Sequence, residues 1–246
     1  MIRYSFKIFC VAFSACFCCA GSLLAEDNNP HTDKMMNEKL NLTQEWDKVF
    51  PKSDKVTHRK VSFRNRYGIM LAADLYMPRN VNEKLPAIAV SGPFGAVKEQ
   101  SAGLYAQTMA ERGFLTIAFD PSYTGESGGF PRYVASPDIN TEDFCAAVDY
   151  LSTRDDVDSE RIGIIGICGW GGMAVNAAAI DTRIKATVTS TMYDMSRVNA
   201  NGYFDAMDAD ARYELRKQLN AQRTADAKSG SYALAGGVPD PLSADA

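Results

Sequence analysis

A single cysteine stands among glycines where an apolar stretch gives way to an alanine-rich one. Residues 161–174 read RIGIIGICGWGGMA, so Cys168 has Gly166 and Gly169 close on either side. Small residues there let a strand and a following helix approach closely, with the reactive atom on the tight turn between them. The pattern predicts a strand, a turn that holds the thiol, and then a helix over residues 171–180.

This placement favours nucleophilic attack by sulfur. Backbone N–H groups at a helix N-terminus stabilise a thiolate relative to the thiol, and the thiolate is the reactive form. We therefore predict that Cys168 is a nucleophile. The alternative is that Cys168 is a small apolar residue buried beneath the sheet, since free cysteines are among the most buried residues.

A literal G-x-S-x-G pattern occurs elsewhere, at residues 125–129, with Ser127 at its centre. In the motif of that name the serine follows a strand and precedes a helix. Here the polar residues 121–124 come before the pattern and Phe130-Pro131 after it, so neither element is expected. We predict that Ser127 is not the nucleophile.

The first residues are typical of a secretory signal peptide. Arg3 and Lys7 precede a mostly apolar run over residues 8–24, which closes on Ala25 before a polar segment. We expect residues 1–25 to be removed and the protein to be exported, to the periplasm or outside the cell. An uncleaved membrane anchor is the alternative, although the run is short for a spanning helix.

The composition that remains excludes several classes of partner. Without residues 1–25, Lys and Arg fall from 26 to 24 while Asp and Glu stay at 30, a net charge of about −6. An acidic chain without a basic cluster disfavours binding to nucleic acid or to an anionic membrane surface. Only Cys145 and Cys168 remain of six cysteines, which argues against a disulfide framework. Cys145 is expected to pack in the core, and no cofactor or metal is expected.

Apolar and amphipathic segments alternate along the rest of the chain. A polar, partly helical lead-in over residues 26–59 precedes a hairpin that turns at Tyr67-Gly68. Apolar runs then alternate with helical patterns, which predicts an α/β fold: a mostly parallel sheet with helices on both faces, over residues 60–191. The buried strands are expected at residues 85–90, 115–119, 162–165 and 184–189, and the helices at residues 99–112, 141–151 and 171–180.

These features resemble the α/β-hydrolase superfamily, and within it the dienelactone-hydrolase-like branch that places a cysteine at the nucleophile elbow. The resemblance rests on the hairpin before the alternating pattern and on three short motifs. They are residues 92–95 (GPFG), residues 120–129 (DPSYTGESGG) and residues 166–169 (GICG). The resemblance covers about residues 60–191 and implies the α/β-hydrolase fold.

The resemblance also implies a reaction and roles for residues. The protein would cleave an ester or thioester of a small-molecule acyl substrate, with Cys168 attacking the acyl carbonyl. The N–H of Gly169, the residue after the nucleophile, would donate to the oxyanion. The second donor would be the N–H of Phe94, because Pro93 has none to give.

Two departures from the family pattern bear on the site. Trp170 stands where a small residue is usual, so either the elbow is looser or Trp170 projects outward into the path of the substrate. The superfamily order is nucleophile, acid and then His, yet His31 and His58 both precede Cys168. We expect the base and the acid to lie outside the 246 residues. Asp194 is a weaker candidate acid, whose alternative is a solvated loop residue.

The segment over residues 192–246 replaces the strands that would hold the acid and the base. A helix over residues 208–228 resembles the cap helices of many of these hydrolases, and an unstructured end follows it. Within this chain the strand at residues 184–189 is expected to have a free edge, and we expect the isolated chain to self-associate there.

Two other functions stay open. A catalytically silent member would bind a small ligand or a partner. An exported peptidase of the same fold is suggested by the similarity of residues 120–129 to a loop of some serine peptidases, although the thiol elbow disfavours it.

Overall fold

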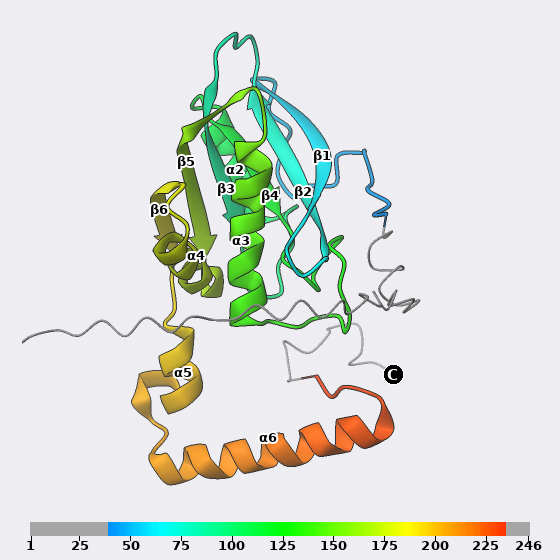
Figure 1. The fold of residues 1–246 in the computed structure, drawn as a ribbon, viewed down its shortest axis with the longest axis vertical. Coiled ribbons are helices and arrows are strands. Elements are labelled where there is room, and N and C mark those ends of the chain that lie inside the picture. Colours follow the sequence, from blue (N-terminus) through cyan, green and yellow to red (C-terminus); the bar gives the residue numbers. More distant parts are fainter. Residues whose placement is uncertain (1–38, 235–246) are drawn as a thin grey trace, which may run out of the picture.

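The computed structural model describes residues 39–234, which form one mixed sheet of six strands with helices on both sides (Figure 1). The expected signal peptide and the last residues of the expected unstructured end lie outside this range. The strands stand in the order β1-β2-β4-β3-β5-β6. Their bounds are β1 Val56–Arg64, β2 Met70–Pro78, β3 Leu85–Ser91, β4 Leu115–Phe119, β5 Val157–Ile167 and β6 Ile184–Ser190.

The antiparallel hairpin of β1 and β2 forms one edge of the sheet. Asn65 closes its turn, since its side-chain oxygen accepts from the N–H groups of Tyr67 and Ile69 at 3.0 and 2.9 Å. Gly68 follows with a φ of +81°, which explains the glycine at this position. The hairpin turn is confirmed, but β1 begins at Val56, four residues before the expected boundary.

The lead-in differs from the expectation of a partly helical segment. Residues 39–55 contain no helix and lie against the sheet as an extended chain. Phe50 is buried, and the indole N–H of Trp46 donates to its carbonyl oxygen at 2.9 Å. The lead-in therefore belongs to the folded body, because its aromatic side chains contribute to the core.

Three helices cover the two faces of the sheet, and the parallel strands β3, β4, β5 and β6 lie between them. Helix α2 (Ser101–Ala110) packs on one face through Ala102, Ala106 and Ala110. Helices α3 (Pro137–Ser152) and α4 (Gly169–Ile180) cover the opposite face. The predicted α/β-hydrolase fold is thereby confirmed, with helix and strand ends that differ from the predictions by a few residues.

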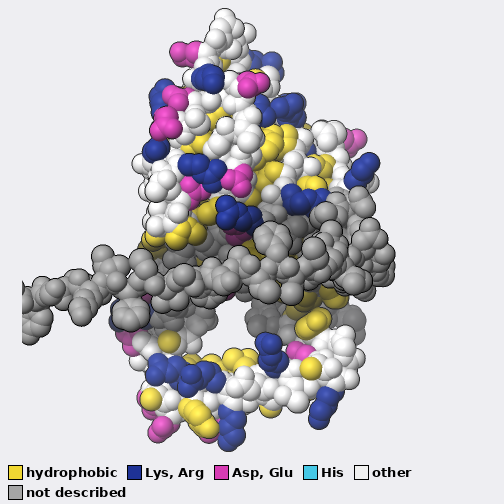
Figure 2. Space-filling view, in the orientation of Figure 1, with side chains coloured by type: hydrophobic (Ala, Val, Ile, Leu, Met, Phe, Trp, Pro, Cys, Tyr) yellow, Lys and Arg dark blue, Asp and Glu magenta, His cyan; other side chains and the backbone are white. Residues whose placement is uncertain are grey.

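Two helices follow the sheet, beyond the carboxyl ends of β5 and β6 (Figure 1). They are α5 (Met195–Asn201) and α6 (Ala209–Ser229), joined by a short 3-10 turn. The side chain of Asp208 accepts from the N–H of Ala211 and begins α6, while Gly230 in a left-handed conformation ends it. None of its side chains is buried, and Figure 2 shows hydrophobic groups on α6 exposed between Lys and Arg. No helix within residues 39–234 has the length and apolar character needed to cross a membrane.

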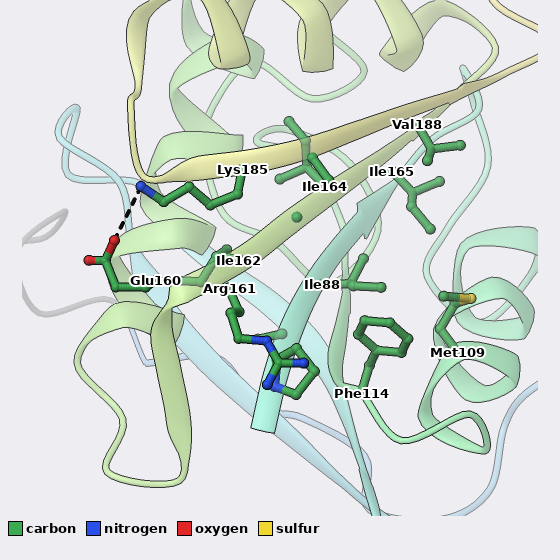
Figure 3. Close-up of a pocket in the computed structure, with 14 residues that line it drawn as sticks. Ile88, Met109, Phe114, Glu160, Arg161, Ile162, Ile164, Ile165, Lys185 and Val188 are labelled. Carbon is green, nitrogen blue, oxygen red and sulfur yellow. Dashed lines mark ion pairs between the residues drawn. The ribbon is translucent and has the colours of Figure 1, made fainter. Parts of the chain in front are cut away.

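The face of the sheet beside α2 carries an open apolar groove. Helix α2 packs on β4 and β3, and beside it the face of β5 from Glu160 to Ile165 and that of β6 at Lys185 and Val188 line the groove (Figure 3). The groove has a volume of about 400 Å³ and is lined by Ile88, Met109, Phe114, Ile165 and Val188 among others. Val188 on β6 is 53% exposed, which contradicts the expectation that this strand is buried on both faces.

We predict that this groove makes the 246-residue chain self-associate. Val188→Lys places a charge in the groove and on the free strand edge, so it should lower both 1-anilinonaphthalene-8-sulfonate fluorescence and the associated fraction in size-exclusion chromatography by roughly half or more. Leu104→Lys on the exposed side of α2 is the matched control. A monomer whose dye binding is the same in both variants would contradict the prediction.

Candidate active site

Cys168 occupies a sharp corner between β5 and α4. Its φ of 58° and ψ of −125° lie in a region that residues with a side chain rarely adopt. The corner is held by two backbone hydrogen bonds: the Cys168 N–H donates to the Ser190 carbonyl at 2.8 Å, and its carbonyl accepts from Gly171 at 3.0 Å. The thiol is half-buried and stands at the N-terminus of α4. This is the geometry of a nucleophile elbow.

The glycines around Cys168 leave room for neighbouring groups that approach the backbone too closely to allow a side chain. A Cβ at Gly166 would lie 2.3 Å from the Trp170 carbonyl oxygen, and one at Gly169 would lie 1.9 Å from the Phe94 ring. Helix α4 therefore begins at Gly169, two residues before the predicted start. Larger side chains would push the helix or the loop after β3 away from the thiol.

The two predicted oxyanion donors lie side by side across this corner. Phe94 is in the loop after β3, and its ring covers Gly169 at the first turn of α4. Among the hydrogen bonds of residues 39–234, none uses the backbone N–H of Phe94 or of Gly169. Neither N–H group is therefore committed to another partner within the described residues.

The side chain of Trp170 does not project outward, so the second of the two alternatives for this residue is wrong. The residue is 3% exposed and its ring meets the Phe94 ring edge-on, with 4.5 Å between centroids. Space for it comes from Gly92, where a Cβ would lie 2.8 Å from the Trp170 Cβ. The buried ring of Trp170 thus packs against the Phe94 ring and helps to hold it in place.

Two cavities flank the elbow. One of about 320 Å³ lies between the loop after β3 and the loop after β4, with Phe94, Arg132 and Trp170 in its wall. The other, of about 330 Å³, includes Gly169 and Asp194. The neighbours Gly169 and Trp170 thus each line one of these cavities, whereas Cys168 itself lines neither.

Asp194 is a helix cap in this structure. Its carboxylate accepts from the Ser196 hydroxyl at 2.6 Å and from the Arg197 N–H at 2.9 Å, at the start of α5. The hydrogen bond from Ser196 and that from Arg197 lower the pKa of this exposed carboxyl below its ordinary value. It borders the second cavity, yet no histidine stands beside it among the described residues.

Ser127 is buried and serves the backbone. Its hydroxyl donates to the Asp120 carbonyl oxygen at 2.7 Å and accepts from the Ala72 N–H at 2.9 Å. It therefore joins the loop after β4 to β2, in agreement with its rejection as nucleophile.

His58 lies on the far side of the sheet from the elbow. It is on β1, four strand positions from β5, a separation on the order of 19 Å at about 4.8 Å per strand. Its ring is hydrogen-bonded to Asp74 at 2.7 Å and packs against Trp46 and Tyr76. His58 is accordingly unsuited to act as the base for Cys168.

Sequence reasoning missed a cluster of buried ion pairs beneath the loops. Lys60 and Lys98 have fully buried side chains and share the carboxylates of Glu99 and Glu126. Lys60 also contacts Asp47 of the lead-in at 2.7 Å. The sequence does not indicate that these lysines are buried, because the segments that cover and neutralise them are far apart along the chain.

Lys98 and Asp47 in this cluster have pKa values that are shifted toward their charged forms. Burial opposes the charge of Lys98, but Asp120, Glu126 and Glu99 together raise the pKa of its ammonium group above the ordinary value. The pKa of Asp47 is lowered to about 2, since hydrogen bonds from Lys48 and Lys60 outweigh the effect of burial. These shifts favour the charged forms of Lys98 and Asp47.

The sheet order, the elbow and the helices on both faces define an α/β-hydrolase fold. Residues 67–235 match the X-Pro dipeptidyl-peptidase (S15) family, and the chain belongs to that family. The predicted superfamily is confirmed. The assignment to the dienelactone-hydrolase-like branch and the cysteine nucleophile remain predictions.

The relatives include proteins without a known activity and hydrolases. The uncharacterized protein PA2218 of Pseudomonas aeruginosa is 68% identical over 198 residues, 80% of this chain and 53% of that protein. Its crystal structure has a TM-score of 0.78 at 63% identity, covering 84% of this chain and 66% of that chain. A thiohydrolase, aneE, of Aspergillus aculeatus is 31% identical over 137 residues, 56% of this chain and 42% of that protein. The chain spans about half the length of the curated relatives it matches.

We predict that iodoacetamide alkylates Cys168 before Cys145 in the folded protein. Burial raises the pKa of the Cys145 thiol to about 11, so at about pH 8 it is almost entirely protonated, whereas Cys168 is half-buried at a helix N-terminus. Peptide mass spectrometry should show labelling of Cys168 at least about tenfold faster. Raising the pH toward 11 should narrow the difference. Equal labelling at about pH 8 with an intact circular dichroism spectrum would make Cys168 a structural residue.

Proposed function

We propose that this chain supplies the nucleophile and oxyanion site of a hydrolase that cleaves esters or thioesters. The observation that carries the proposal is the strained corner at Cys168, which holds the thiol at the N-terminus of α4 beside two unused N–H donors. Strain of this kind persists only where the surrounding structure enforces it, as at the nucleophile of this fold. Thiohydrolases among the relatives support the same class.

The proposed reaction has two steps. The Cys168 thiolate attacks the acyl carbonyl, and the Phe94 and Gly169 N–H groups stabilise the resulting oxyanion. The C–O or C–S bond to the leaving group breaks, which leaves the acyl group on sulfur as a thioester and releases an alkoxide or thiolate that takes up a proton. Water then hydrolyses the thioester and restores the thiol.

The proton transfers require groups that these residues do not bring to Cys168. His58 is held by Asp74 at the far edge of the sheet, and His31 lies outside the described residues. We propose that the base and the acid come from outside the 246 residues. Loss of a catalytic base alone can lower turnover by about 10⁶, so the second step should be slow in this chain.

The prediction that tests this function uses p-nitrophenyl acetate. The 246-residue chain should release about one equivalent of p-nitrophenolate in a burst and then turn over very slowly, because acylation needs only the thiolate and the oxyanion site. Cys168→Ala should abolish the burst. The matched controls Cys145→Ala and His58→Ala should leave its amplitude unchanged. Robust turnover that His58→Ala abolishes would overturn both the site and the origin of the base.

A peptidase is the second candidate, favoured by the family match over residues 67–235. An X-Pro p-nitroanilide should be tested beside the ester with the same variants. Release of p-nitroaniline that depends on Cys168 would support the peptidase. A ligand that binds without any acylation of Cys168 would support the catalytically silent alternative.

Export remains a proposal that rests on the composition of residues 1–25. Amino-terminal sequencing of secreted material should begin near Glu26. Recovery of the intact chain with the membrane fraction would favour the uncleaved anchor.

A further inference from the structure

One residue ties the loop that carries Phe94 to the centre of the sheet. Lys98 ends this loop, and both its backbone and its side chain bind the same carboxylate. Its N–H donates to Asp120 Oδ1 at 2.8 Å, and its ammonium donates to Asp120 Oδ2 at 2.8 Å. Neither side chain has any exposed surface. Two bonds from one residue to one carboxylate fix the orientation of the loop as well as its position.

The carboxylate of Asp120 also holds the loop after β4. Asp120 Oδ2 accepts from the Glu126 N–H at 2.9 Å, and a Cβ at Gly125 would lie 2.3 Å from the same oxygen. The ammonium of Lys98 extends the link by contacting Glu126 at 2.7 Å. The two loops therefore share one anchor, and together they form the wall of the 320 Å³ cavity beside Phe94.

The stretch of chain between Pro93 and Lys98 has few other attachments. Within it the Ala96 N–H donates to the Pro93 carbonyl and the Val97 N–H donates to the Gln100 side chain, both at 3.2 Å. Both bonds are internal to the loop and its immediate continuation. Apart from the packing of the Phe94 ring on Trp170, the backbone at Phe94 is thus constrained by the end of β3 on one side and by the Lys98 anchor on the other.

We infer that Asp120 and Lys98 are positioning residues that aim the Phe94 N–H at the oxyanion formed on Cys168. This inference rests on the proposed function. It predicts a defect confined to steps that form an oxyanion. Acylation by an ester forms one, whereas alkylation by iodoacetamide displaces iodide at a saturated carbon and forms none.

The experiment compares the two reactions of Cys168 in the folded 246-residue chain. Asp120→Asn keeps the shape of the side chain but removes the charge and turns an amide group toward a donor. We expect it to slow the p-nitrophenyl acetate burst by at least about tenfold, toward the ~10²–10³ that loss of one oxyanion donor costs. The iodoacetamide rate should stay within about twofold, since the thiol itself is unchanged.

Asp74→Asn is the matched control, because Asp74 is also a fully buried carboxylate that binds a lysine but contacts neither loop. It should leave both rates unchanged. Phe94→Pro removes the donor itself, so Asp120→Asn should add no further slowing in that background. If the double variant is slower than Phe94→Pro alone, Asp120 acts through the general stability of the protein and not through the Phe94 N–H.

The outcomes separate the inference from the proposed function. A wild-type chain that is alkylated at Cys168 but never acylated would refute the proposed function. A wild-type burst that Asp120→Asn leaves unchanged would refute the inference alone. If Asp120→Asn does not give a folded monomer or dimer, Lys98→Gln tests the same anchor, since it keeps the backbone hydrogen bond to Asp120. An unchanged ratio of the burst rate to the iodoacetamide rate in Lys98→Gln would also refute the inference.

Discussion

Buried lysines and the carboxylates that neutralise them are the constraint on which the rest of the structure depends. Lys48, Lys60 and Lys98 have no exposed side-chain surface, and each contacts at least two carboxylates. Removing one partner of such a pair typically costs ~3–5 kcal/mol, because an uncompensated charge stays behind. The partners lie in the lead-in, the hairpin and the loops after β3 and β4. These four segments can therefore adopt only arrangements that keep the charges together.

The elbow depends on a different constraint, which is the absence of side-chain volume. Gly166 and Gly169 allow β5 and α4 to meet, and Gly92 leaves room for Trp170. The tryptophan fills this space and supports Phe94, whose ring in turn covers Gly169. A residue that departs from the family pattern is thus accommodated by a glycine on the neighbouring strand end. The loop after β3 is therefore held by the ion pair of Lys98 with Asp120 and by the packing of Phe94 on Trp170.

Local patterns were enough to predict most of the fold but little of the loop geometry. The strand over residues 115–119 was predicted with its observed bounds, because four apolar residues and Thr116 between a glycine turn and a polar loop allow few alternatives. The start of β1, the extended lead-in and the burial of Trp170 were missed, since each depends on contacts with distant segments. The corner at Cys168 was predictable because its glycines are sequence neighbours. The anchor between Lys98 and Asp120 was not, because Lys98 lies in the loop before α2 while Asp120 follows β4, and no sequence pattern pairs the two residues.

The position of the buried charges along the chain has a consequence for the order in which the protein takes shape. All members of the ion-pair cluster lie between Asp47 and Glu126, so every one of them precedes Cys168 in the sequence. A chain made from its N-terminus can neutralise these charges among themselves before the thiol has been synthesised. The anchor that holds the loop bearing Phe94 therefore consists entirely of residues that are synthesised before Cys168.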